Sequence, residues 1–236
     1  MIYVTSDLHG CSPETLERLL RKANFTPEDY LFVLGDVIDR GKHGAELLLW
    51  LTQQSNVQLI LGNHEALLLS CAFLFEEVTE ESLERLTAKQ LELAENWLRN
   101  GGAPTMAGLR RLLKADPELL EGILDYLQDA PLFESLRVNG RRYILVHSGL
   151  GNFRPDKQLP EYTAEELLFT RPDPDTRYYD DATVILGHTP TLSYGEDYRG
   201  RALKARDFIC IDTGAALGEN PMLLRLEDLR EFYLNP

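Results

Sequence analysis

The chain has 236 residues, a formal net charge of −14 and a hydrophobic content of 44%. This length fits one folded unit over residues 1–236, since single cores stay favourable up to roughly 250 residues. The hydrophobic content excludes a disordered or collagen-like chain.

Several kinds of partner and compartment are disfavoured by the composition. No apolar run approaches the roughly 18 residues that a membrane span needs, and the first residues carry no signal-peptide pattern. The acidity argues against nucleic-acid binding, which requires a basic face. The odd number of cysteines, three, lacks metal-type spacing and favours a reducing compartment. We therefore expect a cytoplasmic protein without nucleic-acid or membrane partners.

Six short apolar segments each end at a polar turn. Near-continuous apolar runs of this length predict strands buried on both faces. They span residues 2–5, 30–34, 57–61, 143–146, 183–186 and 208–211.

Helical patterns lie between these segments, at residues 13–23 after the N-cap candidate Ser12 and at residues 45–51. Strands that alternate with helices indicate an α/β core. Residues 66–135 interrupt the alternation, because they are mostly helical and show no convincing strand. We predict that they form a cap-like helical insertion within the domain, covering one face.

Polar residues with metal-binding side chains follow five of the predicted strands. Asp7 and His9 are two apart, so in an extended conformation both project to the same side. The others directly follow a strand, and they are Asp36, Asn63, His147 and His188. Ligand sites in open α/β sheets gather beyond the carboxyl ends of strands. A mixed nitrogen and oxygen donor set without thiolate suits Mn, Fe, Zn or Ni.

The charge of such a site points to a phosphate substrate. Two divalent ions, two carboxylates and a bridging hydroxide leave about one net positive charge, and paired metals roughly 3.5–4 Å apart support in-line displacement by an activated water. The sequence contains neither a Gly-x-Ser-x-Gly elbow nor a Walker-type loop.

Five motifs in order resemble the signature of the calcineurin-like metallophosphoesterases. They are Asp7-Leu8-His9, residues 35–41 (GDVIDRG), residues 62–65 (GNHE), His147 and Gly187-His188. The second and third together resemble the phosphoprotein phosphatase branch. Residues 97–102 and 168–172 are similar to small bacterial and bacteriophage enzymes that remove phosphate from Ser/Thr and sometimes Tyr. The resemblance implies a layered fold with two central mixed β-sheets flanked by helices.

The resemblance also implies roles for individual residues. Two divalent metal ions, with Mn favoured and Fe, Zn or Ni as alternatives, would share Asp36 as a bridge. Asp7 and His9 would hold the first ion, and the second would be held by Asn63, His147 and His188.

His64 would protonate the leaving-group oxygen as general acid, with Asp39 orienting its imidazole. A carboxylate beside a histidine helps the histidine to keep its proton near neutral pH. Arg40 and Arg171 would bind the non-bridging phosphate oxygens through planar, bidentate contacts.

We therefore expect a metal-dependent phosphomonoester hydrolase, a Ser/Thr or dual-specificity protein phosphatase acting on a phosphorylated protein, a peptide or a small phosphoester. A symmetrical dinucleoside tetraphosphate hydrolase is the enzymatic alternative. That group usually has Ala in place of Asp39, so Asp39 disfavours it. A catalytically inactive phosphate-binding scaffold is the non-enzymatic alternative.

Three further charged features are not expected to take part in catalysis. Glu65 is expected only to open a helix, where its charge meets the positive end of the dipole. The basic cluster at residues 199–206 is interpreted as a solvated edge. Residues 76–95 carry a local charge of −5, which would favour basic substrates if they face the cleft and would have no effect if they point away.

Overall fold

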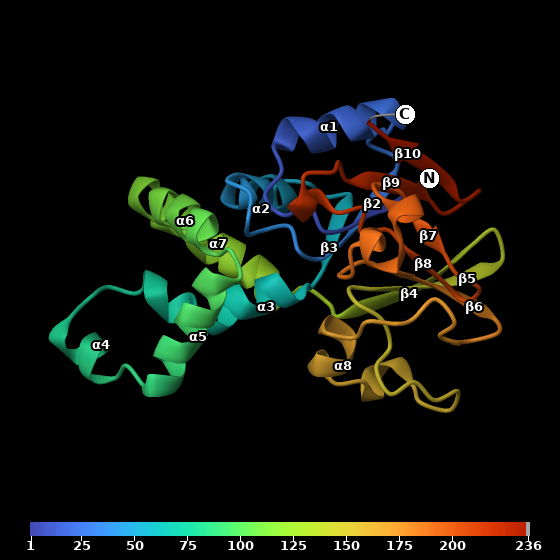
Figure 1. Ribbon diagram of the computed structural model, residues 1–236. Helices are drawn as coiled ribbons and strands as arrows, with labels where there is room; N and C mark the ends of the chain where they lie inside the picture. Colours follow the sequence, from blue (N-terminus) through green and yellow to red (C-terminus); the bar gives the residue numbers. More distant parts are fainter. Residues whose placement is uncertain (235–236) are drawn as a thin grey trace.

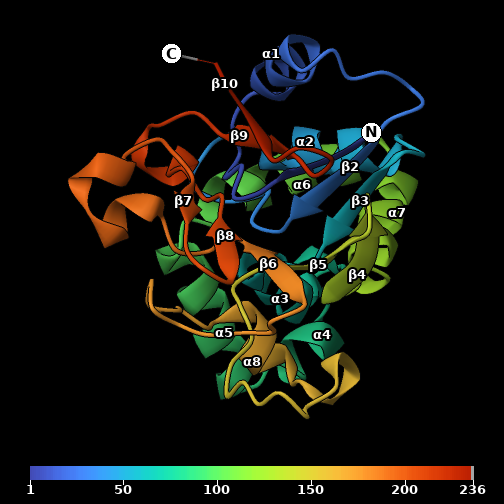
Figure 2. The ribbon, with the colours of Figure 1, turned by 90° about the vertical axis from the view of Figure 1, so that its right-hand side faces the viewer.

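The computed structural model describes residues 1–234 and contains two five-stranded β-sheets packed face to face between helical layers (Figures 1 and 2). This confirms the predicted α/β architecture of two mixed sheets flanked by helices. Each sheet has three adjacent parallel strands and two antiparallel strands.

The first sheet has the order β10-β9-β1-β2-β3. Its parallel strands are β1 (Ile2–Thr5), β2 (Tyr30–Leu34) and β3 (Val57–Ile60). The antiparallel strands β9 (Met222–Arg225) and β10 (Arg230–Tyr233) extend it on one side.

The second sheet has the order β4-β5-β6-β8-β7. Its parallel strands are β5 (Arg141–Val146), β6 (Ala182–Leu186) and β8 (Phe208–Cys210). The antiparallel strands β4 (Phe133–Val138) and β7 (Leu203–Lys204) form its edges.

The parallel strands are mostly buried on both faces, as their apolar runs predict. Val4 and Leu34 join Leu145 and Ile185 in the core between the two sheets, whereas Tyr3 belongs to the core beneath the helices. Successive side chains of a strand point to opposite faces. A strand between two cores therefore needs apolar residues at every position.

Helices lie outside the two sheets (Figure 1). The helices are α1 (Pro13–Lys22), α2 (Gly44–Thr52), α3 (Asn63–Ser70), α4 (Glu80–Glu84), α5 (Ala88–Arg99), α6 (Ala103–Ala115), α7 (Pro117–Gln128) and α8 (Ala164–Leu168). Of these, α4 and α5 project away from the sheets (Figure 1). Short 3-10 turns span Ala72–Phe75, Leu159–Glu161, Thr191–Tyr194, Glu196–Tyr198 and Ala215–Leu217. Ser12 caps α1 as predicted, because its hydroxyl accepts a hydrogen bond from the Thr15 amide at 3.2 Å. In the part of the chain described, no helix combines the length and apolar character needed to cross a bilayer.

The prediction that residues 66–135 contain no strand is wrong at its end. Helix α7 stops at Gln128, and β4 begins at Phe133 and pairs with β5. Asn139 and Gly140 connect these strands with φ of 49° and 80°. Consecutive positive φ values are typical of the tight turns of β-hairpins, and Asn-Gly is their strongest sequence signal. The strand escaped prediction because only Val138 of its six residues is buried, so it has no continuous apolar run.

The acidic segment 76–95 lies mostly on α4 and the first part of α5. Figure 1 shows α4 at the outer tip of the part formed by helices α3 to α7, far from both sheets. Glu81 pairs with Arg85 on its exposed surface. This placement favours the solvated interpretation of these charges over a role in attracting basic substrates.

Candidate metal centre

The six predicted ligand residues follow the carboxyl ends of parallel strands from both sheets. Within residues 1–234, ten residues other than glycine have a positive φ angle. Six of these ten are predicted site residues. They are Asp7, His9, Asp36, Asp39, Arg40 and His188. Such backbone costs about 1–3 kcal/mol per residue and clusters at functional sites.

The expected extended conformation of Asp7 and His9 is wrong. Their φ values of 51° and 41° place both in the left-handed region. The His9 amide donates to the Asp36 carbonyl at 2.8 Å and the Asp7 amide donates to the Gly35 carbonyl at 3.0 Å. These bonds connect the turn after β1 to the turn after β2, so residues 7–9 form a turn and not an extended segment.

One group of acceptor atoms converges around His147. Its Nδ1 donates to the Leu34 carbonyl at 2.7 Å, so Nε2 presents a lone pair. That Nε2 lies 2.8 Å from Asn63 Oδ1, 3.2 Å from His188 Nδ1 and 3.5 Å from Asp36 Oδ1. Acceptors that face one another in a buried site are satisfied by a shared cation.

A second group meets the other oxygen of the same carboxylate. Asp36 Oδ2 lies 3.7 Å from His9 Nε2 and 3.8 Å from His64 Nε2. In each group, the His nitrogens and Asp oxygens that could bind a metal ion lie within 4.8 Å of one another. Asp36 therefore stands between two candidate cation positions.

Asp7 lies outside both groups. Its buried carboxylate accepts the His188 amide at 3.1 and 3.0 Å. Burial, followed by the nearby Asp212 and Asp36, raises the pKa of Asp7 well above its ordinary value. A nearby cation would oppose this rise by compensating the concentrated negative charge.

The protonation states suit metal binding. Burial lowers the pKa of His9 to about 3 and that of His188 to about 3. Burial also opposes ionisation of Asp36, but the surrounding His147, His64 and His9 outweigh it and lower the pKa of Asp36. Neutral imidazoles and an ionised carboxylate are the forms that bind metals, so the donor set fits a pair of divalent ions.

His64 is held by a chain of hydrogen bonds from the helical part. Its Nδ1 lies 2.6 Å from Asp39 Oδ2, and the Trp97 indole donates to both oxygens of Asp39 at 3.2 and 3.0 Å. Burial alone lowers the pKa of His64, but the hydrogen bond to Asp39 and the charge of Asp36 outweigh it and raise the pKa. The imidazole therefore retains a proton that it can donate.

The two arginines lie at the rim, both exposed. Arg40 places Nη1 3.2 Å from His9 Nε2 and Nη2 3.4 Å from His64 Nε2. Arg171 donates through Nη1 to the His188 carbonyl at 3.3 Å and to Thr189 Oγ1 at 3.2 Å. The structure thus brings both predicted phosphate-binding residues to the centre.

The interpretation that Glu65 only opens a helix is wrong. Its fully buried carboxylate accepts the backbone amides of Asp36, Val37, Ile38 and Gly62 at 2.8 to 3.3 Å. Burial and then the charge of Asp36 raise the pKa of Glu65 to about 7. Glu65 therefore fixes the turn that carries Asp36, a role that no local sequence signal reveals.

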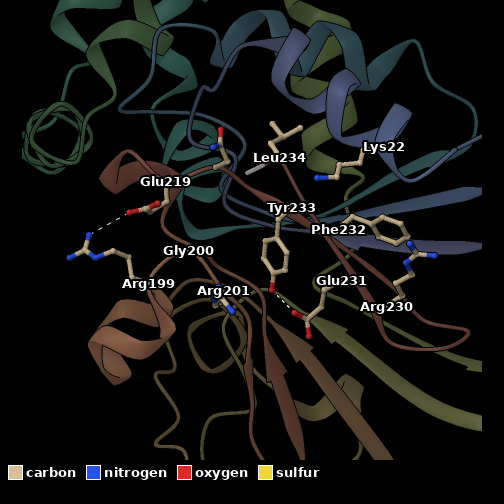
Figure 3. Close-up of a pocket in the computed structure, with 11 residues that line it drawn as sticks. Lys22, Arg199, Gly200, Arg201, Glu219, Arg230, Glu231, Phe232, Tyr233 and Leu234 are labelled. Carbon is tan, nitrogen blue, oxygen red and sulfur yellow. Dashed lines mark hydrogen bonds and ion pairs between the residues drawn. The ribbon is translucent and has the colours of Figure 1, made fainter. Parts of the chain in front are cut away.

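A separate groove of about 480 Å³ lies along the edge strand β10, beside Lys22 at the end of α1 and the turn at Gly200 (Figure 3). Arg199 pairs there with Glu219 at 3.4 Å, and Lys204 pairs with Glu231. The basic cluster at residues 199–206 is thus a surface edge of mixed charge.

Together, the layered fold and the centre at its strand ends define a phosphoesterase-type α/β protein. The chain belongs to the calcineurin-like phosphoesterase family, whose model matches residues 1–217. This confirms the resemblance seen in the motifs. Members of this family use divalent metal ions, in agreement with the donor groups around Asp36.

Curated relatives carry the name symmetrical bis(5'-nucleosyl)-tetraphosphatase. The protein of Acidovorax ebreus is 30% identical over 71% of this chain, and that of Actinobacillus pleuropneumoniae is 35% identical over 98%. The chain covers 47% of the first and 97% of the second. It spans about half the length of several such relatives.

Solved structures of low sequence identity share the fold. A candidate diadenosine tetraphosphatase has a TM-score of 0.62 at 19% identity, covering 100% of this chain and 94% of that one. A Saccharomyces cerevisiae protein serine/threonine phosphatase has a TM-score of 0.56 at 14% identity, covering 100% and 80%. These likenesses establish the architecture alone.

Proposed function

We propose that this protein hydrolyses phosphoric esters or anhydrides at a centre of two divalent metal ions. The observation that carries the proposal is the position of Asp36, whose two carboxylate oxygens face two separate groups of buried donor atoms. When bound, the ions would supply positive charge to phosphate oxygens and lower the pKa of an attacking water. Mn²⁺ is the first metal to test, and the three free cysteines fit the reducing cytoplasm.

The protein's own side chains would carry out the remaining tasks. Asp7, His9 and Asp36 would hold one ion, and Asp36, Asn63, His147 and His188 would hold the other. Arg40 and Arg171 would bind phosphate oxygens from the exposed rim. His64, oriented by Asp39, would give its proton to the departing oxygen.

We infer that symmetrical dinucleoside tetraphosphates are the leading substrate class. The support comes from the names of relatives that match this chain at 27% to 38% identity. These relatives favour the tetraphosphatase alternative over the protein phosphatase that the motifs favoured. Phosphorylated Ser or Thr remains the second candidate, because the 2.6 Å bond between His64 and Asp39 suits protonation of a poor alkoxide leaving group.

One assay separates these functions. The purified, Mn²⁺-loaded protein is incubated with diadenosine tetraphosphate, a phosphothreonine peptide and p-nitrophenyl phosphate. Conversion of diadenosine tetraphosphate to ADP as the sole nucleotide product supports symmetrical cleavage. Turnover of the peptide without the dinucleotide would instead identify a protein phosphatase. Failure with all three substrates, repeated with Fe²⁺, Zn²⁺ and Ni²⁺, would point to an inactive scaffold.

A further inference from the structure

An aromatic side chain stands open to solvent beside the metal centre. Phe169 is 54% exposed and is the only aromatic among the large exposed hydrophobic side chains of residues 1–234. Its ring centroid lies 6.3 Å from that of His188, at an interplanar angle of 89°. A planar group bound next to the centre can therefore stack on it.

The backbone on both sides of Phe169 is anchored to the loop behind the centre. Ser148, which directly follows His147, donates from its hydroxyl to the Leu167 carbonyl at 2.8 Å. The same hydroxyl accepts a hydrogen bond from the Thr170 amide at 3.0 Å. Phe169 lies between these two bonds, so its position is fixed relative to His147 before any ligand binds. A preorganised aromatic side chain loses little conformational entropy on binding.

The hollow beside Phe169, about 560 Å³, suits an uncharged group with amino hydrogens. Glu166 is already engaged there by Lys157 at 2.8 Å and by the Asn152 amide nitrogen at 3.0 Å. That bond leaves the Asn152 side-chain oxygen as an acceptor. The exposed Glu165 carboxylate has no ion pair within residues 1–234. These acceptors repel phosphate and accept hydrogen bonds from an exocyclic amine.

Arg171, a proposed phosphate-binding residue, lies two positions after Phe169. Arg171 uses only Nη1 on His188 and Thr189, which leaves its other N–H groups for a phosphate. A ligand that carries an anionic phosphate joined to a neutral aromatic amine therefore matches this rim. We propose that Phe169, Asn152 and Glu165 form a nucleobase site that binds an adenine-type base of the substrate. This inference rests on the proposed function and assigns its substrate recognition.

The test measures binding, so that it does not depend on turnover. Isothermal titration of the Mn²⁺-loaded protein compares ADP, which carries the base, with pyrophosphate, which lacks it. Wild type should bind ADP more tightly than pyrophosphate. Phe169→Ala should weaken ADP binding by roughly tenfold, in line with base–aromatic stacking, and leave pyrophosphate unchanged. Phe169→Trp should keep the preference for ADP. Leu91→Ala is the matched control, because Leu91 is 56% exposed on the remote helix α5.

Three outcomes would overturn the nucleobase site. The first is equal binding of ADP and pyrophosphate by wild type. The second is that Phe169→Ala loses affinity for ADP and pyrophosphate equally, which would indicate a structural defect. The third is that Phe169→Ala binds phenyl phosphate more weakly while its ADP binding is unchanged. That result would show that the Phe169 ring contacts an aryl ester such as a phosphotyrosyl side chain. If ADP selectivity follows expectation but diadenosine tetraphosphate is not cleaved, the nucleobase site is supported and the proposed substrate fails.

Discussion

Asp36 is the residue on which the two donor groups depend, because each of its oxygens serves one of them. Asp36→Asn replaces one anionic oxygen by an amide nitrogen that repels a cation. We expect fewer than two bound metal ions per chain and a loss of kcat greater than about 10²-fold, beyond what indirect partners of metals contribute. Elemental analysis and steady-state kinetics measure both quantities. Asp156→Asn, at an exposed position, is the control. Full metal content with wild-type turnover would refute the bridging role.

His64 is the proposed general acid, and its imidazole is held by Asp39, which in turn accepts a hydrogen bond from Trp97. His64→Asn should leave the metal content unchanged and lower kcat on alkyl phosphoesters by roughly 10²–10⁴-fold. The loss should be smaller on p-nitrophenyl phosphate, whose leaving group needs little protonation. Equal losses on both substrates would show that His64 positions phosphate and does not act as an acid.

At the scale of elements, α5 and α6 support the turn that carries Asp39 and Arg40, which lies far away in sequence. Trp97 on α5 donates to Asp39, Thr105 Oγ1 on α6 accepts the Asp39 amide at 2.9 Å, and the Gly101 carbonyl accepts the Arg40 amide at 2.9 Å. These hydrogen bonds hold Asp39, the proposed partner of the general acid, and Arg40, a proposed phosphate-binding residue.

Trp97→Phe tests this support. The change keeps most of the packing of a fully buried ring but leaves Asp39 without the indole donor. We expect a loss of about 1–3 kcal/mol in the free energy of unfolding, the cost of an unsatisfied buried acceptor, together with lower kcat on alkyl esters. Chemical denaturation and kinetics provide the measurements. Trp50→Phe, in the partly buried other tryptophan, is the control. If the two variants have the same kcat, Trp97 does not support Asp39.

The turn between β2 and α2 depends on Glu65 at the start of α3. Glu65→Gln keeps the shape but turns one acceptor oxygen into a donor that faces backbone N–H groups. We expect a loss of about 2–3 kcal/mol in the free energy of unfolding, since the variant leaves buried amides unsatisfied. We also expect weaker metal binding, because the Asp36 amide is one of the groups that Glu65 holds.

Denaturant titration and metal titration of Glu65→Gln measure these two effects. Glu95→Gln, at an exposed position of α5, should change the free energy of unfolding by less than about 0.5 kcal/mol. A Glu65 variant as stable as wild type would contradict the anchoring role.

For the whole molecule, the centre joins the two sheets, since His9 and Asp36 follow strands of the first sheet and His147 and His188 follow strands of the second. A ligand that binds only the folded state stabilises it by about 2.7 kcal/mol at a hundredfold excess over Kd. For a chain of this size that corresponds to a Tm change of about 5–10 °C. We expect chelation to lower Tm by this amount and Mn²⁺ to restore it in calorimetry. An unchanged Tm after verified metal removal would contradict a metal that spans the sheets.

Local patterns were sufficient to predict the three parallel strands of each sheet and the polar residues that gather at their carboxyl ends. A strand buried on both faces needs apolar side chains at every position, which makes β1, β2, β3, β5, β6 and β8 visible in the sequence. The carboxyl ends of parallel strands meet at one edge, so the residues after them could be placed together without a structure. The antiparallel strands β4, β7, β9 and β10 were missed. β4 and β10 are partly exposed and β7 has only two residues, so they lack that apolar run, and the buried run of β9 ends after three residues at Arg225.

Other features were decided only by the tertiary structure, because they depend on contacts between residues distant in sequence. Glu65 reaches amides 27 to 29 residues away, and Trp97 reaches Asp39 across 58 residues. The left-handed backbone of Asp7 and His9 follows from hydrogen bonds to the next strand's turn. No local sequence signal shows that Phe169 is exposed beside His188, with Ser148 bonded to the backbone on both sides of it.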